Sequence, residues 1–413
     1  MTADLRIKPE RLLVDLADLA KIGGTTESGV SRPAFSDPDL EARDWFQARA
    51  ESAGFTVKRD GIANISAIYP SSNPDAQTVL FGSHMDTVPN GGRFDGALGT
   101  LTALEALRTI KEAGLSLPVH LEAISFSDEE GTWAGLTGSR GIAGHLTESE
   151  FEHPRGDRDS YHERLKAAGV TIESAFGAKR DPATIKAWVE VHIEQGVRLT
   201  DADLHVGVVT GIVGIASYWL TFQGRAGHAG TTPMRERLDA MRGVAEFVQQ
   251  SRELVMNRFR SGVVNCGDVQ VSPGAFNIIP AEARMALEFR HSDPMVLEAM
   301  REALINLALH IVEVEGLGLE VEQVGIHEPG IMHRDVITAL EKSCNLLGLR
   351  HQTMPAYAGH DTQVMAAITK AGMFFVPSVD GISHNPQEFT SDEDCINAGN
   401  VLLHTVLNLA QSE

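Results

Sequence analysis

The chain has very little cysteine. Cys266, Cys344 and Cys395 are the only three in 413 residues, and they lie far apart without a CxxC pair. An odd number of separated cysteines indicates neither a disulfide framework nor a cysteine zinc site. We therefore expect a protein of the reducing cytoplasm.

Long apolar runs are also missing. No segment approaches the uncharged apolar length that spans a bilayer, and the N-terminal MTADLRIKPERLLVDLADLA has no cleavable signal pattern. We expect a soluble protein.

Basic residues are outnumbered. There are 35 Lys and Arg against 56 Asp and Glu, which gives a formal net charge of −21 at pH 7. The acidic residues are spread along the chain and form no block at either end. Nucleic acids and anionic membranes need a basic face, so the composition argues against both as partners. Solubility is a sufficient role for the negative charge.

The first half of the sequence alternates helical patterns with short apolar strands. This alternation predicts an α/β fold with a mostly parallel sheet covered by helices on both faces. Functional residues of such sheets collect just past the carboxyl ends of the strands. The predicted helices cover residues 9–22, 37–53 and 98–113, and the predicted strands cover 64–69, 78–83 and 119–126.

The order of elements changes between residues 211 and 326. A β-α-β-β-α-β order there predicts a ferredoxin-like α+β domain, inserted into a first domain made of residues 1–210 and 327–413. The chain length also favours two domains. Residues 147–182 are polar, and we expect them to be irregular. The elements of the insert are predicted at 216–223, 238–257, 263–271, 283–291, 294–315 and 317–323; those after it are helices at 336–347 and from Thr362, and a strand at 372–376.

Residue types that bind metal ions follow several of the predicted strands. Three histidines with carboxylates form a nitrogen and oxygen donor set that suits zinc, manganese, nickel or cobalt. Such a set favours two ions with a carboxylate bridging them. A doubled glutamate offers one metal ligand and one general base. The candidates are His84, Asp86, Asp95, Glu129, Glu130, His192 and His384.

Each of these residues also has an ordinary interpretation. A single histidine is most often structural or solvent-facing, and Glu129-Glu130 alone could be a solvated turn. Five candidate ligands at the ends of successive strands favour a metal site over these separate roles.

Seven segments, in this order along almost the whole chain, resemble the amidase branch of the M20 metallopeptidases. That branch contains N-carbamoyl-L-amino acid hydrolases, allantoate and ureidoglycolate amidohydrolases and β-ureidopropionases. The HIEQG run at residues 192–196 distinguishes it from aminoacylases and dipeptidases. The matching segments are Gly82–Pro89, Gly91–Gly96, Asp128–Gly131, His192–Gly196, Gly227–Gly230, Asn277–Pro280 and Gly381–His384.

The resemblance implies a zinc-peptidase-like catalytic domain with two divalent ions, for which zinc is expected before manganese, nickel or cobalt. One ion would be held by His84, Asp95 and His192. The other would be held by Asp95, Glu130 and His384, with Asp95 as the bridge. Asp86 would orient His84, and Glu129 would be the general base.

The resemblance also implies residues that contact the substrate. His228 would be donated by the inserted domain, acting as a dimerisation and lid domain, to the active site of a homodimer partner, where it stabilises the oxyanion. Asn277 and Arg290 would hold the substrate carboxylate, Gln195 would contact the ureido group, and His360 would line the pocket or lie behind a ligand. Without the resemblance, Arg290 could be a surface strand charge and Gln195 could cap a turn.

We expect an amidohydrolase that cleaves the terminal carbamoyl C–N bond of N-carbamoyl-L-amino acids and releases the amino acid, CO2 and ammonia. Allantoate, ureidoglycolate and β-ureidopropionate are alternative substrates; an N-acyl amino acid or dipeptide hydrolase and an inactive dimeric binding protein are further alternatives. The sequence departs from the family at residues 130–140, where the loop is short and carries Trp133. We expect Trp133 to reshape the pocket wall.

Overall fold

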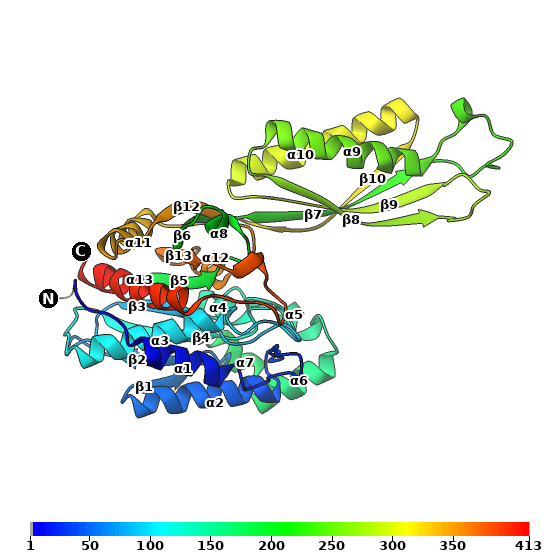
Figure 1. The fold of residues 1–413 in the computed structure, drawn as a ribbon. Helices are drawn as coiled ribbons and strands as arrows, with labels where there is room; N and C mark the ends of the chain where they lie inside the picture. The colour runs from blue at the N-terminus through cyan, green and yellow to red at the C-terminus, as the bar shows by residue number, and fades with distance from the viewer. Residues whose placement is uncertain (1–2, 413) are drawn as a thin grey trace. The chain divides into compact units, whose positions relative to one another are not determined.

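The computed structural model describes residues 3–412 (Figure 1). Within them the chain divides into two compact units. Unit 1 takes in the chain up to Thr210, Met332–Met354 and the chain from His360 onward. Unit 2 is made of Gly211–Ile331 and Pro355–Gly359.

Unit 1 is built on a mixed sheet whose centre is parallel. Seven of its strands lie in the order β1-β2-β4-β3-β5-β13-β6, and β12 (His351–Ala356) also pairs with β6. β3 is parallel to β4 and β5, and β5 is parallel to β13, whereas the β1-β2, β2-β4 and β13-β6 pairs are antiparallel. The predicted α/β class with a mostly parallel sheet is confirmed. The strands are β1 (Thr56–Arg59), β2 (Ile65–Tyr69), β3 (Thr78–His84), β4 (His120–Phe126), β5 (Ile185–Ile193), β6 (Val206–Ile212) and β13 (Ala371–Val376).

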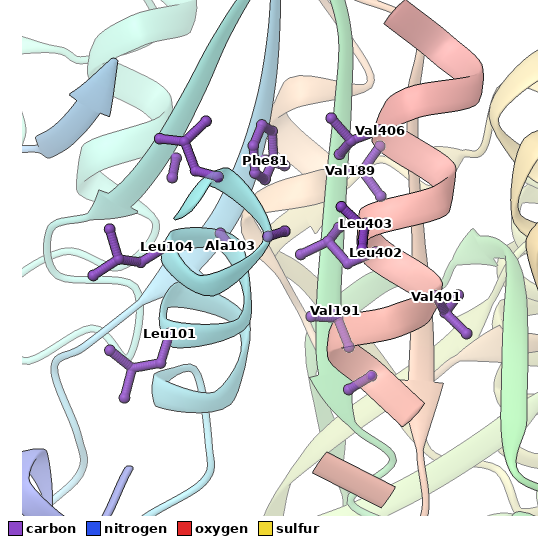
Figure 2. Packing of buried hydrophobic residues seen from close by; sticks show 14 of the residues in the cluster. Phe81, Leu101, Ala103, Leu104, Val189, Val191, Val401, Leu402, Leu403 and Val406 are labelled. Atoms are coloured by element: carbon purple, nitrogen blue, oxygen red, sulfur yellow. The ribbon is translucent and has the colours of Figure 1, made fainter. Parts of the chain in front are cut away.

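Helices cover this sheet and bury its apolar side chains. The helix α3 is buried along nearly its whole length, because it packs against α1 and α13 as well as against β3 and β4. Figure 2 shows Phe81 of β3 and Val189 of β5 with apolar side chains of α3 and α13 in one cluster. Each such side chain contributes roughly 1.5–3 kcal/mol when it is fully buried. The helices are α1 (Pro9–Leu19), α2 (Asp37–Ser52), α3 (Ala97–Glu112), α4 (Thr137–Ala143), α11 (Arg334–Leu346), α12 (Asp361–Met365) and α13 (Asp392–Gln411).

The prediction that residues 147–182 are irregular is wrong. They contain three short helices, α5 (Glu148–Glu152), α6 (Arg158–Ala167) and α7 (Ile172–Phe176). Side chains cap each helix start: Thr147 and Thr171 belong to capping boxes, and Asp157 accepts from the N–H of Ser160. Their apolar residues join a separate small cluster, so tertiary packing stabilises helices that are too short to form alone.

Unit 2 has the predicted order β-α-β-β-α-β. Its four strands form an antiparallel sheet in the order β10-β7-β9-β8. Burial alternates along β7 and β9, and their buried residues form one core with α9 and α10. The elements are β7 (Gly214–Gln223), α9 (Ala240–Arg258), β8 (Val263–Ser272), β9 (Glu282–His291), α10 (Pro294–Glu315) and β10 (Gly318–His327).

Every helix within residues 3–412 is too short or too polar to cross a bilayer.

Candidate metal centre

The candidate ligands lie at the carboxyl ends of neighbouring strands of unit 1. His84 is the last residue of β3 and is in register with Phe126, the last residue of β4. Glu129 and Glu130 follow β4 directly. His192 is near the end of β5, in register with Phe375 of β13. Because parallel strands end at the same edge of the sheet, residues distant in sequence meet there.

The first ligand group contains His84, Asp95 and His192, all buried, with ligand atoms within 4.8 Å of one another. The Oδ1 atom of Asp95 lies 3.0 Å from Nε2 of His192 and 3.5 Å from Nε2 of His84. Two imidazoles and a carboxylate converging in this way match the donor set of a zinc site.

The second ligand group contains Asp95, Glu130 and His384, again within 4.8 Å. Nε2 of His384 lies 3.7 Å from Oδ2 of Asp95 and 3.3 Å from Oε2 of Glu130. The side chain of His384 is 49% exposed, unlike the other ligand candidates. The structure therefore brings together the five residues proposed as ligands, with Asp95 in both groups.

The hydrogen bonding of the two buried imidazoles leaves Nε2 of each directed at the ligand groups. Nδ1 of His84 lies 3.0 Å from the main-chain oxygen of Asp86, and Nδ1 of His192 lies 3.0 Å from the main-chain oxygen of Ile193. An Nδ1–H bonded to a carbonyl fixes the tautomer in which Nε2 is the unprotonated nitrogen. Nε2 of His84 has no hydrogen bond, whereas Nε2 of His192 accepts the main-chain N–H of Gly96 at 3.3 Å.

Two buried atoms of the groups lack partners that a cation would supply. Among residues 3–412, Nε2 of His84 and Oε1 of Glu130 are buried without a hydrogen bond. Burial of an unpaired polar atom is costly. Burial also raises the pKa of Glu130 to about 8, and the nearby charge of Asp95 adds to this shift. Divalent cations would offset both effects, so the residues present fit a two-metal centre.

Glycine is needed where the loop that carries Asp95 passes His84. Gly96 has a φ of 61°, and a Cβ atom there would lie 2.3–2.4 Å from the imidazole atoms of His84. Glycine adopts a positive φ without strain, and its lack of a Cβ atom leaves room for the ring.

Glu129 lies beside the first ligand group but belongs to neither group. Its Oε2 atom is 3.5 Å from Nε2 of His84. Burial raises its pKa well above the ordinary glutamate value, more than the charge of His84 lowers it. A buried carboxylate with a raised pKa is suited to accept and return a proton.

Asp86 supports the segment with the two glutamates. Its Oδ1 and Oδ2 atoms accept from the main-chain N–H groups of Glu129 and Glu130, at 3.4 and 3.2 Å. Its carboxylate is 3.7 Å from Nδ1 of His84, farther than its own main-chain oxygen. Burial raises the pKa of Asp86 to about 6.

Asp128, for which the sequence predicts no role, holds the loop after the glutamates. Its carboxylate accepts from the N–H groups of Trp133, Ala134 and Gly135 and from the Thr137 hydroxyl, at 2.6 to 3.3 Å. The one sequence signal was its place directly before Glu129.

Trp133 packs within the cluster of α5–α7. Its ring stacks on Tyr161 at 5.0 Å between centroids, and its indole N–H donates to the main-chain oxygen of Ala34. The departure from the family therefore lies in a well-packed loop beside Glu130.

Two further predicted site residues lie in unit 1 beside the ligands. Gln195 has a φ of 56°, and its side-chain amide donates to Oδ2 of Asp95 at 2.8 Å. The buried ring of His360 lies 4.5 Å from that of His192, centroid to centroid. Burial lowers the pKa of His360 well below its ordinary value, and the charge of His192 adds to this.

The remaining predicted residues belong to unit 2. The exposed His228 and Asn277 are close, because residues 227–229 pair with 277–279 through main-chain hydrogen bonds. Arg290 is half-buried on β9, where it donates to Glu288 and to the main-chain oxygen of Tyr357.

The chain is similar to known proteins over most of its length. Residues 80–408 match Peptidase family M20/M25/M40. An N-carbamoyl-L-amino acid amidohydrolase of Geobacillus stearothermophilus is 37% identical over 98% of this chain and 100% of that relative. An allantoate amidohydrolase of Escherichia coli is 32% identical over 91% of this chain and 92% of that relative. The crystal structure of an amidase of the hydantoinase/carbamoylase family from Burkholderia multivorans matches with a TM-score of 0.90 and 33% identity, over 99% of each chain.

Proposed function

Because the chain belongs to peptidase family M20/M25/M40, we propose that it is a metal-dependent amidohydrolase acting on N-carbamoyl-L-amino acids. It cleaves the terminal carbamoyl C–N bond and releases the amino acid, CO2 and ammonia. The observation that carries this proposal is the pair of ligand groups sharing Asp95, with Glu129 beside them. Several relatives that align over nearly the whole chain are named for this reaction.

The two ligand groups would hold two divalent ions, with Asp95 as the bridge. The nitrogen and oxygen donors favour zinc, and they also suit manganese, nickel or cobalt. When bound, such ions polarise a substrate carbonyl and lower the pKa of a water molecule. No thiolate takes part in either group.

Glu129 is the proposed general base. It would take the proton of the attacking water and return it to the departing nitrogen, which requires a carboxylate that gains and loses a proton near neutral pH. Its raised pKa supports this role. The N–H groups of Glu129 and Glu130 are held by Asp86, which keeps the base and the ligand Glu130 in a fixed relation.

Further residues have proposed roles in holding the substrate or in supporting the ligands. Arg290 and Asn277 would bind the substrate carboxylate, since a guanidinium matches a carboxylate with two parallel hydrogen bonds. The side-chain amide of Gln195 would contact the ureido group, and the ring of His360 would pack against that of His192. His228 would donate a hydrogen bond to the developing oxyanion, an effect worth a few kcal/mol.

We further propose a homodimer in which the partner subunit's His228 completes each site. This proposal is supported by where the residues lie in the chain. The five ligand candidates belong to unit 1, whereas His228 belongs to unit 2. A dimer with two-fold symmetry would exchange this residue reciprocally.

Allantoate is the second candidate substrate. The resemblance to the Escherichia coli allantoate amidohydrolase favours it, and allantoate also carries a carboxylate and a terminal ureido group. The two candidates use the same metal chemistry and differ at the carbon that bears the carboxylate, where allantoate has a second ureido group in place of an amino acid side chain.

A substrate panel tests the proposal. Ammonia release is measured from N-carbamoyl-L-amino acids, their D-enantiomers, allantoate, ureidoglycolate and β-ureidopropionate. The highest kcat/KM is expected for an N-carbamoyl-L-amino acid. A higher kcat/KM for allantoate would assign the alternative, and release from none of these compounds would overturn the proposed function.

A further inference from the structure

Glu388 is a buried carboxylate in the segment that follows His384, and only 3% of it is exposed. Its Oε1 atom accepts from the main-chain N–H groups of Phe94 and Asp95, at 2.8 and 3.1 Å. It therefore holds the backbone of a residue that lies 293 positions earlier in the chain and contributes to both ligand groups.

Ser383 connects the same two segments through side chains. Its hydroxyl donates to Oδ2 of Asp95 at 2.7 Å and lies 3.3 Å from Oε2 of Glu388. Ser383 directly precedes His384, and Glu388 follows it by four residues. The His384 segment thus grips both the main chain and the side chain of Asp95.

The loop that carries Asp95 is shaped to receive the Glu388 carboxylate. A Cβ atom at Gly92 would lie 1.9 Å from the carboxyl carbon of Glu388 and 2.0 and 2.2 Å from its oxygens. Any larger residue at position 92 would displace the carboxylate from the N–H groups of Phe94 and Asp95.

We infer that Glu388 is a positioning residue that fixes the Asp95 loop against the His384 segment, and so sets the spacing within the second ligand group. Glu388 acts through its hydrogen bonds to the two main-chain N–H groups. It is not proposed to bind an ion itself. The inference rests on the proposed two-metal centre. Partners of metal ligands of this kind change metal affinity by roughly 10-fold to 100-fold when removed.

The test is a calorimetric titration of metal-depleted full-length protein with Zn²⁺ and, separately, with Mn²⁺. The unsubstituted protein is expected to bind two ions per chain. In Glu388→Ala, the dissociation constant of the more weakly bound of the two ions should rise by at least roughly tenfold. Glu388→Gln keeps an acceptor oxygen at the same reach and should recover most of the affinity, whereas Glu388→Asp is one methylene too short and should not.

Glu105→Ala is the matched control. Glu105 is also a fully buried glutamate that accepts a main-chain N–H, that of Lys8, but it lies on α3, where its other partners include Arg11 but no residue of either ligand group. This variant should lower the Tm of the metal-free protein and leave both ion affinities unchanged. Gly92→Ala displaces the Glu388 carboxylate without removing it, so it provides the test if Glu388→Ala does not fold.

Two outcomes overturn the inference: unchanged ion affinity in Gly92→Ala or Glu388→Ala, and a better recovery by Glu388→Asp than by Glu388→Gln. Failure of the unsubstituted protein to bind any ion would instead overturn the proposed metal centre.

Discussion

Asp95 places its Oδ1 atom 3.0 Å from Nε2 of His192. The other oxygen of the same carboxylate, Oδ2, faces His384 at 3.7 Å. One side chain thus divides its two oxygens between the two ligand groups, which is the geometry that a bridging carboxylate requires.

Glu129→Gln should reduce kcat by roughly 10²–10⁴-fold while metal content stays near two ions per chain, because Glu129 is assigned as base and not as ligand. Metal content is measured by elemental mass spectrometry on the same sample as the kinetics. Glu130→Gln is the comparison, since it should lose metal as well as activity. Parallel loss of metal and kcat in Glu129→Gln would make Glu129 a ligand.

Arg290→Leu should raise KM for carboxylated ureido acids by roughly 10-fold to 100-fold, because the substrate carboxylate loses charged hydrogen bonds. An amide analogue without the carboxylate should be affected much less. Arg284→Leu is the control: Arg284 lies on the same strand, paired with Glu322, and should leave both KM values unchanged. If both substrates suffered equally from Arg290→Leu, the residue would be structural.

Co-expression of Glu129→Ala and His228→Ala chains tests the exchange of His228 between subunits. Each variant alone should be nearly inactive. A mixed dimer would contain one site with both lesions and one with neither, so random pairing should restore roughly a quarter of the normal activity. Mass measurement establishes that mixed dimers have formed. If those dimers were inactive, His228 would serve the site of its own chain.

Glu122→Gln tests a buried ion pair that ties the α5–α7 region to β4. Arg180 donates two hydrogen bonds to Glu122, at 2.7 and 2.8 Å. Burial tends to raise the pKa of Glu122, but the bonds from Arg180 outweigh burial and hold the pKa below its ordinary value. The stability that this lowered pKa represents is present above the unfolded value of about 4.3 and is lost as the pH falls through the folded value.

The free energy of unfolding of Glu122→Gln should therefore be about 2 kcal/mol lower than that of the unsubstituted protein at pH 7. This difference should become smaller below about pH 4. Thermal unfolding of both proteins from pH 3 to pH 7 measures the difference. A difference in stability that does not change with pH would mean that the charge of Glu122 does not stabilise the fold.

Local patterns predicted β3, β4 and α3, which lie beside His84, Asp95 and Glu129, but β5, which carries His192, was not among the predicted strands. The apolar runs that end at His84 and Phe126 indicated strands, and the residues after them were predicted to meet because parallel strands end together. The glycines around Asp95 marked the loop. His384 was named because it follows the predicted strand at 372–376.

Other parts of the structure have no periodic pattern in the sequence that would predict them. Glu388 and Asp128 act through main-chain N–H groups, and in the case of Glu388 these belong to residues 294 and 293 positions earlier in the chain. The helices α5–α7 depend on packing around Tyr161 and Phe151. Such long-range contacts are set by the folded chain as a whole, so they appear only in the structure.

The central claim is that metal ions held by these residues drive hydrolysis of a carbamoyl group. Its most direct test is ammonia release from an N-carbamoyl-L-amino acid by protein depleted of metal with a chelator, before and after Zn²⁺, Mn²⁺, Ni²⁺ or Co²⁺ is restored. Activity should fall to background and return with at least one of these ions, since the ligands are nitrogen and oxygen atoms. Full turnover by protein shown to be free of metal would contradict the account.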